Sequence, residues 1–462
     1  MIRIRARALT AGRLLHRVRG AHSNHRRIAA GAATIALLTL LAKAFVAARE
    51  IAIAWRYGVS ATVDAYQLSF TIVTWLPMLL SAVMAVVLVP RMVALSRRRE
   101  ARLQFLSEFN GTILLVGVGI GLLTFLAAPW VSRIMASGLD SATVRLTRLM
   151  VERLCPIAFF MILSGYLTAR LQAKERFGYT ITEAVPALAI AGFLLSSWAR
   201  HTIAPLILGA VIGYMAQAII LVRLVARGDP PIGEVIFRHR SEEWRTFYQS
   251  VLMMAVGQFV ITATVPIDQA FAARVAPGAV ATLGYANRIV TLFTGLASVV
   301  IGRALLPVLS TAVAEGDLVL GRRHTLQWAS LMFGAAFGLS AALWAITPEL
   351  VRLLFQRGAF QPSATQAVSE VMRYGLFQIP FFFGGIALVQ WVAATGNYRD
   401  IVAVTVVALI VKLILNFILV RRFGLDGIMI SSAAMYFVTS ALLLLKIGRT
   451  TAQAGSAFET RL

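Results

Sequence analysis

The sequence predicts an all-helical membrane protein with about twelve transmembrane helices arranged as two lobes of six, with a central cavity between the lobes. Three observations predict this fold: the apolar composition, the length of the apolar segments, and a repeated set of prolines. Of the 462 residues, 59% are hydrophobic and 14% are charged, and the mean hydropathy is +0.78. An ordinary soluble domain carries about 25% charged residues, so this composition excludes that class.

Apolar segments of membrane-spanning length follow one another along the chain. A transmembrane helix needs roughly 17 to 25 mostly apolar residues to cross the hydrocarbon layer. The segments that meet this requirement predict spans at 28–57, 62–90, 109–135, 150–171, 181–199, 203–224, 246–274, 280–312, 326–347, 373–395, 400–420 and 424–447.

Three prolines of the first half recur in the second half at offsets of 217 to 224 residues. This spacing predicts an internal repeat of six helices. Because six is an even number, both halves enter the membrane from the same side, which gives a parallel repeat with a site between the lobes near the bilayer midplane. The proline pairs are Pro90 with Pro307, Pro129 with Pro348, and Pro156 with Pro380.

The repeat predicts the domain organisation. A basic arm at 1–27 precedes an N-terminal lobe at 28–226, and a C-terminal lobe at 246–448 precedes a tail at 449–462. The linker at 227–245 contains a Gly-Asp-Pro-Pro turn and several basic residues. We expect the arm, the linker and the tail to be cytoplasmic.

The net charge of +24 could indicate nucleic-acid binding, so the distribution of the charge decides its meaning. Of the 44 Lys and Arg residues, 27 fall in the tails and the even-numbered connections and 10 in the odd-numbered ones. This asymmetry follows the positive-inside rule and predicts a multi-pass protein of the bacterial inner membrane with both termini in the cytoplasm. Anionic lipids are then the expected partners of the basic segments, and nucleic acid is not.

Charged residues occur inside the predicted spans of both halves. Lys43 and Arg49 lie in the first span, and Asp64 opens the second. A charge in a bilayer core costs roughly 2.5 to 3.5 kcal/mol on insertion scales, so such residues face a wet cavity or a partner. In the second half, Asp268 and Arg288 occupy the seventh and eighth spans. Either ion pairs that lock helices together or a charged internal site explains them.

Helical geometry groups some of these charges. Lys43 and Glu50 are seven residues apart and share one helical face, whereas Arg49 points about 120° away. Lys412 and Asn416 lie one turn apart in the eleventh span. Lys412 either reaches a neighbouring carbonyl group or acts as a tethered cation opposite Asp268.

Four short motifs carry a resemblance to a known family. The stretch REIAIAWRYGVSATVDAY at 49–66 resembles the first signature of the MurJ/MviN family of lipid II flippases, within the wider superfamily of multidrug, oligosaccharidyl-lipid and polysaccharide exporters. GYANR at 284–288 and LLPVLS at 305–310 resemble the family's next segments, and LFQRGAF at 354–360 matches its Leu-Phe-x-x-Gly-x-Phe turn. The matches run in order across nearly the whole chain.

The resemblance implies a set of substrate-binding residues. The family's cavity arginine and aspartate fall on Arg49 and Asp64, and its arginine between the seventh and eighth helices falls on Arg288. Lys43 stands where relatives of the enterobacterial type have arginine. Glu50 and Asn287 stand in place of aspartates, and we expect both to support the cavity.

Two further departures from the family pattern concern one residue and the number of helices. Thr291 replaces a glutamate, and the chain has two predicted helices fewer than the fourteen of the family type. Family members can hold a coupling cation among the seventh, eleventh and twelfth helices. Asp268, Lys412 and Asn416 are therefore candidates for ion coupling, with the membrane potential or a monovalent cation as the energy source and no other cofactor.

The implied substrate is an undecaprenyl-diphosphate-linked glycan, most simply lipid II, moved from the inner to the outer leaflet by alternating access. Arginine offers a planar, permanently charged fork for phosphate oxygens, and lysine adds a compact charge. An exopolysaccharide or O-antigen lipid carrier remains an alternative substrate, and an inactive scaffold within a cell-wall or polysaccharide synthesis complex, or a multidrug exporter, remains an alternative role. An enzyme is not expected, because six histidines show no HExxH spacing and the single cysteine, Cys155, excludes a thiolate zinc site.

Overall fold

A computed structural model describes residues 37–196, 202–227, 234–315 and 317–459, and the regular structure in these ranges is helical. The predicted arm at 1–27 lies outside them. The first helix is described over 37–57. The others are α2 (Ala61–Ala94), η1 (Leu95–Arg97), α3 (Arg99–Met135), α4 (Ser141–Leu154), α5 (Pro156–Gln172), η2 (Phe177–Glu183), α6 (Ala184–Leu195), α7 (Ala204–Ala226), α8 (Glu243–Thr262), α9 (Thr264–Ala272), α10 (Ala279–Ala314), α11 (Leu318–Phe355), α12 (Pro362–Leu376), α13 (Gln378–Ala394) and α14 (Tyr398–Glu459).

Each predicted span has a helical counterpart in the described ranges. Eight helices are long and apolar enough to cross a membrane, or nine if the bent pair α4 and α5 forms one span. One of these helices, α14, holds two of the predicted spans, 400–420 and 424–447, because Gly424 breaks it with φ 55° and ψ −129°. It continues to Glu459, so the segment predicted as a tail after residue 448 begins as helix. The prediction of an all-helical, multi-pass membrane protein is confirmed.

The prolines of the repeat fall at matching places in the two halves. Pro129 and Pro348 lie inside α3 and α11, and Pro90 and Pro307 lie in α2 and α10. Pro156 begins α5 after a 47° bend from α4, whereas Pro380 lies in the first turn of α13, which continues α12 as one span. A proline lacks the N–H that would bond to the preceding turn, so it fixes where each helix bends or starts.

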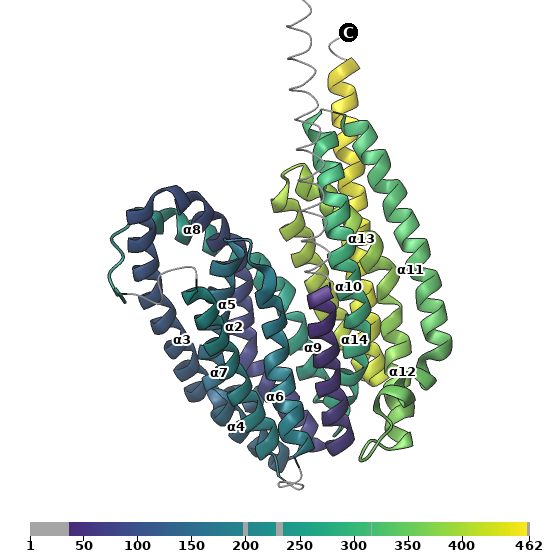
Figure 1. Ribbon diagram of the computed structural model, residues 1–462. Coiled ribbons are helices and arrows are strands. Elements are labelled where there is room, and N and C mark those ends of the chain that lie inside the picture. The colour runs from purple at the N-terminus through teal and green to yellow at the C-terminus, as the bar shows by residue number, and fades with distance from the viewer. Residues whose placement is uncertain (1–36, 197–201, 228–233, 316, 460–462) are drawn as a thin grey trace, which may run out of the picture.

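Figure 1 shows two groups of helices that lie apart at the end carrying the C terminus and meet at the opposite end. Helices α2 to α7 pack together in one group, and α10 to α14 pack in the other. Each group has its own apolar core, and a third cluster joins the groups. Large apolar side chains such as Leu115 and Phe337 are 67% and 63% exposed, as expected of surfaces that face lipid.

The end of the linker is fixed to the N-terminal group of helices by one buried carboxylate. Glu108 of α3 accepts hydrogen bonds from the backbone N–H groups of Arg240 and Ser241, at 3.1 and 3.2 Å, and from the indole of Trp244 at 2.6 Å. Trp244 also stacks on Phe109 at 5.7 Å. Helix α8 packs mainly on α2 and only weakly on α14. The first part of the seventh span is thus attached to the N-terminal helices.

The predicted lobe boundary at 227–245 stays a prediction, but the packing of the seventh span bears on it. A break at Ala263 separates α8 from α9, and α9 packs on α14 and α10 as well as on α2 and α3. The second part of this span therefore contacts both groups of helices.

Candidate functional site

A cavity of about 600 Å³ lies where the two groups of helices face one another. Its walls come from the first helix, the end of η2, α10 and α11. Most of the lining is apolar, and four charged side chains project into it. These are Lys43, Glu50, Glu183 and Arg288.

Three predicted site residues meet at one edge of this cavity. Glu50 Oε1 accepts a hydrogen bond from Arg49 Nε at 3.1 Å and forms an ion pair with Arg288 Nε at 3.4 Å. Arg49 is nearly buried, and its guanidinium lies 5.7 Å from the centre of the Phe70 ring. The Arg288 side chain is 47% exposed and faces the cavity. Because Arg288 belongs to α10 and the other two residues to the first helix, this cluster joins the two lobes.

Lys43 lines the same cavity but is not part of this cluster. Its side chain is exposed, and no ion pair joins it to any other described residue. Glu183, at the end of η2, lies on the same cavity wall, and Lys43 is the charged group that acts on its carboxylate. Sequence reasoning missed Glu183. A single acid at the start of the predicted fifth span was the available signal.

Two predicted site residues lie elsewhere. Asp64 is fully buried, and its carboxylate accepts hydrogen bonds from the backbone N–H groups of Gly278 and Ala281, the latter at 2.7 Å. Asp64 therefore does not pair with the cavity cations, because the positive N-terminal end of α10 holds its carboxylate. Asn287 does not line the cavity, since it precedes Arg288 on α10 and is turned about 100° from it.

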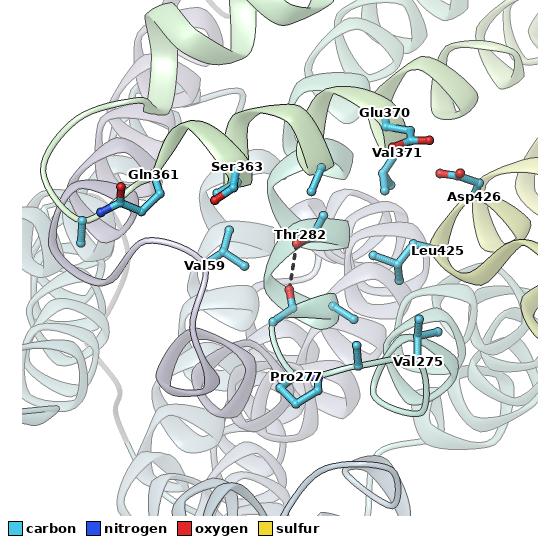
Figure 2. A pocket seen from close by; sticks show the side chains of 16 residues that line it. Val59, Val275, Pro277, Thr282, Gln361, Ser363, Glu370, Val371, Leu425 and Asp426 are labelled. Carbon is cyan, nitrogen blue, oxygen red and sulfur yellow. Dashed lines mark hydrogen bonds between the residues drawn. The ribbon is translucent and has the colours of Figure 1, made fainter.

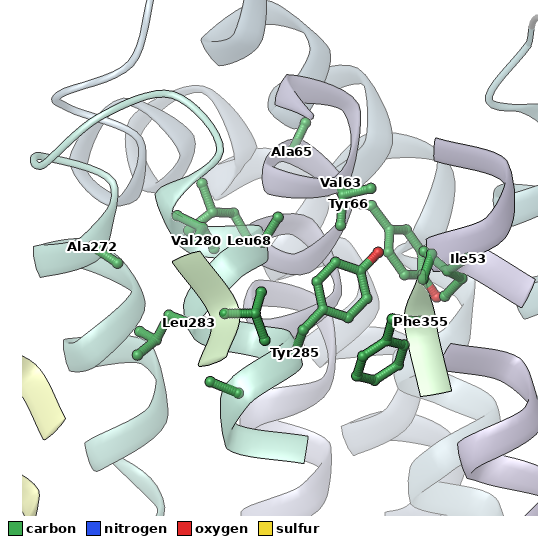
Figure 3. Close-up of a cluster of buried hydrophobic side chains, with 14 of the residues drawn as sticks. Ile53, Val63, Ala65, Tyr66, Leu68, Ala272, Val280, Leu283, Tyr285 and Phe355 are labelled. Carbon is green, nitrogen blue, oxygen red and sulfur yellow. The ribbon is translucent and has the colours of Figure 1, made fainter. Parts of the chain in front are cut away.

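Asp64 belongs to a seam that closes the cavity at one end. The Tyr285 hydroxyl donates to the carbonyl oxygen of Gly58 at 3.0 Å, and the N–H of Ala359 donates to the carbonyl of Trp55 at 2.8 Å. Figure 3 shows Tyr285 packed between the α2 corner and Phe355 of α11. These contacts join the first helical hairpin to α10 and to the turn after α11.

Two glycines of the seam lie at close contacts, and glycine is required at Gly58. Gly58 has a φ of +57°, and a Cβ atom there would lie 2.3 Å from the carbonyl oxygen of Ala359. At Gly284, a Cβ atom would lie 1.9 Å from Gln67 Oε1. A side chain at position 58 would meet the backbone of the turn after α11, whereas one at position 284 would meet only the flexible end of Gln67, which would have to move.

A second pocket, of about 490 Å³, lies on the far side of the seam (Figure 2). Val59, Thr282 and Gln361 line it, and the carboxylates of Glu370 and Asp426 face its far end. None of its described lining residues is basic. The described lining of this pocket is therefore acidic, whereas the cavity on the other side of the seam also holds Lys43 and Arg288.

The candidate ion-coupling residues form a separate cluster within the C-terminal lobe. Lys412 Nζ lies 3.0 Å from Asp268 Oδ1, and the Asn416 amide donates to the same oxygen at 3.1 Å. Lys412 also donates to the hydroxyl of Ser432, which sequence reasoning missed. Lys412 is 1% exposed and Asn416 is fully buried. The cluster ties α9 to both parts of α14, and the lysine ammonium occupies its centre.

Comparison with known proteins places these features in a family. The family model described as "Lipid II flippase MurJ" matches residues 53–460. The chain belongs to the MurJ lipid II flippase family. Among curated MurJ proteins, a probable lipid II flippase of Synechocystis is 24% identical over 445 residues, which cover 92% of this chain and 83% of that protein. The lipid II flippase of Burkholderia cenocepacia is 25% identical over 438 residues, covering 89% and 82% of the two chains.

Solved structures of MurJ and of related transporters share the fold. A lipid II flippase MurJ in an inward closed conformation superimposes with a TM-score of 0.78 at 16% identity, over 90% of this chain and 87% of that one. An inward-facing multidrug transporter of the MATE family has a TM-score of 0.74 at 13% identity, over 91% and 99% of the chains. At these identities the likeness concerns the fold, and the MurJ assignment rests on the family model.

Proposed function

We propose that this protein is a flippase that moves an undecaprenyl-diphosphate-linked glycan, most simply lipid II, from the inner to the outer leaflet of the bacterial inner membrane. Support comes from membership of the MurJ family and from the charged cavity. Neither the diphosphate nor the glycan crosses a bilayer unaided, because removing such polar groups from water is prohibitively costly.

The observation that carries the proposal is the Arg49–Glu50–Arg288 cluster at the edge of the cavity. Glu50 neutralises two guanidinium groups when the site is empty, which lowers the cost of keeping them away from bulk water. A diphosphate offers the same groups more oxygen acceptors in the bidentate geometry that guanidinium favours. Substrate can therefore replace Glu50 as the partner of Arg288, with Lys43 as a further cation on the same wall.

The seam bears on which side of the membrane the cavity opens to. With Asp64 and Tyr285 holding the lobes together at one end, the cavity is closed to the side that carries the 58–60 and 356–361 turns. From the distribution of Lys and Arg, we expect that side to face the periplasm and both termini to face the cytoplasm. We therefore take this to be an inward-facing state, whose exchange with an outward-facing state depends on differential binding of substrate to the two. Anionic lipids and cell-wall synthesis proteins are the partners we expect.

Lys412 has a proposed role in coupling. An ammonium group already occupies the space between Asp268, Asn416 and Ser432. We propose that it serves as a fixed internal cation, so that transport needs no metal ion at this position. If Lys412→Asn leaves both the transport rate and its dependence on monovalent ions unchanged, this role is wrong.

Complementation tests the proposed function directly. The native protein should rescue growth of a bacterial strain depleted of its own lipid II flippase, whereas Arg49→Ala and Arg288→Ala should fail despite normal membrane levels. Equal rescue by all three proteins would rule out this site. If the native protein does not rescue growth but restores surface display of an exopolysaccharide or O-antigen in a strain lacking that flippase, the alternative lipid-carrier substrate is correct.

A further inference from the structure

The cavity is lined by one pair of opposite charges, Lys43 and Glu183, that are not part of the Arg49–Glu50–Arg288 cluster. Lys43 lies on the first helix and Glu183 at the end of η2, and both side chains are exposed to the cavity. Neither forms an ion pair or a hydrogen bond with any other described residue. A charged group inside a predicted membrane span usually faces water or a counter-charge, and such residues are functional candidates by default.

The charges of Lys43 and Glu183 interact although the two side chains form no ion pair. Lys43 acts electrostatically on the Glu183 carboxylate, although the pair is not in direct ion-pair contact. Tyr214 of α7 lies within the fields of Arg49, Arg288 and Glu183, so the carboxylate belongs to the same charged region as the guanidinium cluster. A ligand can enter between Lys43 and Glu183 without first breaking a short ion pair.

The number of acidic and basic side chains in the cavity lining indicates which charge Glu183 offsets. Among the described residues, two basic and two acidic side chains line the cavity, and Glu50 is already paired with Arg288. Glu183 is then the acid that remains to offset Lys43. It lowers the net attraction of the cavity for an anion, and it restores a neutral pair when the anion leaves. Tight capture alone would not help a transporter, because the substrate must also be released.

Resting on the flippase function proposed above, we propose that Glu183 is a positioning and release residue: its carboxylate is the displaceable counter-ion of Lys43, which a phosphate group of the lipid headgroup replaces on binding and which returns when the headgroup leaves. Glu50 performs the corresponding exchange at Arg288. The cavity therefore holds one displaceable carboxylate for each phosphate of a diphosphate.

Binding of undecaprenyl diphosphate to the full-length protein in detergent micelles, followed by native mass spectrometry, tests this inference. In Glu183→Gln the anion no longer has to displace a competing carboxylate from Lys43, so this variant should bind it roughly 3- to 10-fold more tightly. The rate of transport in proteoliposomes should fall at the same time. A purely structural role would weaken both measurements together.

The controls separate the electrostatic role from damage to the fold. Glu370→Gln removes a carboxylate outside this cavity and should change neither measurement. Glu183→Asp keeps the charge and should behave close to the native protein. In a Lys43→Gln background, Glu183→Gln should lose its effect on binding, because the cation that it offsets is gone.

Several outcomes would overturn the inference. Unchanged or weaker binding by Glu183→Gln would do so, and so would an equal gain in the Lys43→Gln background. If Glu183→Gln weakened only the binding of headgroups that carry a free amine, Glu183 would be an amine ligand instead. Binding that is lost in Arg288→Ala but insensitive to Glu183→Gln contradicts this inference alone, whereas no binding by the native protein contradicts the proposed function as well.

Discussion

The molecule contains two clusters of buried charge that use similar residues in different surroundings. Arg49, Glu50 and Arg288 join the two lobes, and the half-exposed Arg288 faces a cavity of about 600 Å³. Asp268 and Lys412, with Asn416, join helices inside one lobe and are almost inaccessible to solvent. The first arrangement leaves a cation free to exchange partners, whereas the second leaves none. Accessibility, rather than charge, separates a binding site from an internal lock.

The largest effect should come from breaking the inaccessible pair. Lys412→Met leaves the Asp268 carboxylate buried without a counter-charge, which typically costs 3 to 5 kcal/mol. We expect a large fall in the melting temperature of the purified protein. The double variant Lys412→Met with Asp268→Leu removes both charges and should recover most of the lost stability. A single variant as stable as the native protein would show that the pair is not a lock.

The second effect concerns the accessible cluster. Arg288→Ala should reduce the transport rate in proteoliposomes roughly 10- to 100-fold, equivalent to about 1.4 to 2.7 kcal/mol, because one guanidinium fork for phosphate is lost. Its melting temperature should stay close to that of the native protein, since this side chain is half exposed. A large loss of stability with unchanged transport would reverse the distinction between the two clusters.

A smaller effect is expected at the seam, where the contact is between lobes but uncharged. Tyr285→Phe removes the hydrogen bond to the Gly58 carbonyl and leaves that buried acceptor without this donor, a change of about 1 kcal/mol. The equilibrium should shift toward the state with an open periplasmic end. Labelling of a single cysteine introduced at Thr282, beside the seam, should become roughly fivefold faster. Unchanged labelling would mean that this bond does not hold the seam.

The smallest effect belongs to a charge pair outside both clusters. Arg148 and Glu152 form an ion pair of 2.7 Å one turn apart on α4, and their side chains are 51% and 30% exposed. Because water screens such a pair, Arg148→Ala should change stability by only about 0.3 to 0.5 kcal/mol. A change in melting temperature as large as that of Lys412→Met would undermine the claim that burial sets the value of these contacts.

Hydropathy and proline spacing were enough to predict the fold. Apolar runs of membrane-spanning length predicted the helices, and Pro129 and Pro348, one pair of the predicted repeat, both lie inside long helices, α3 and α11. The convergence of Arg49, Glu50 and Arg288 followed from the cost of charge in a membrane, which leaves few places for such residues to go.

Three residues, Asp64, Glu183 and Ser432, owe their places to contacts between distant segments, which no local sequence pattern predicts. Asp64 bonds to backbone N–H groups more than 200 residues away, and the nearby cations gave no hint of that alternative. Glu183 depends on how η2 is placed beside the first helix. Ser432 looked like a small residue in an apolar span until packing brought it to Lys412. Sequence reasoning could name the charges but could not choose their partners.

Transport of fluorescent lipid II by purified protein in liposomes tests the central claim most directly. The account predicts that the native protein moves the lipid between leaflets and that a folded Arg49→Ala, Arg288→Ala double variant does not, while Arg148→Ala retains the native rate. Transport by the double variant at the native rate would contradict the claim that this pair of guanidinium groups grips the diphosphate headgroup.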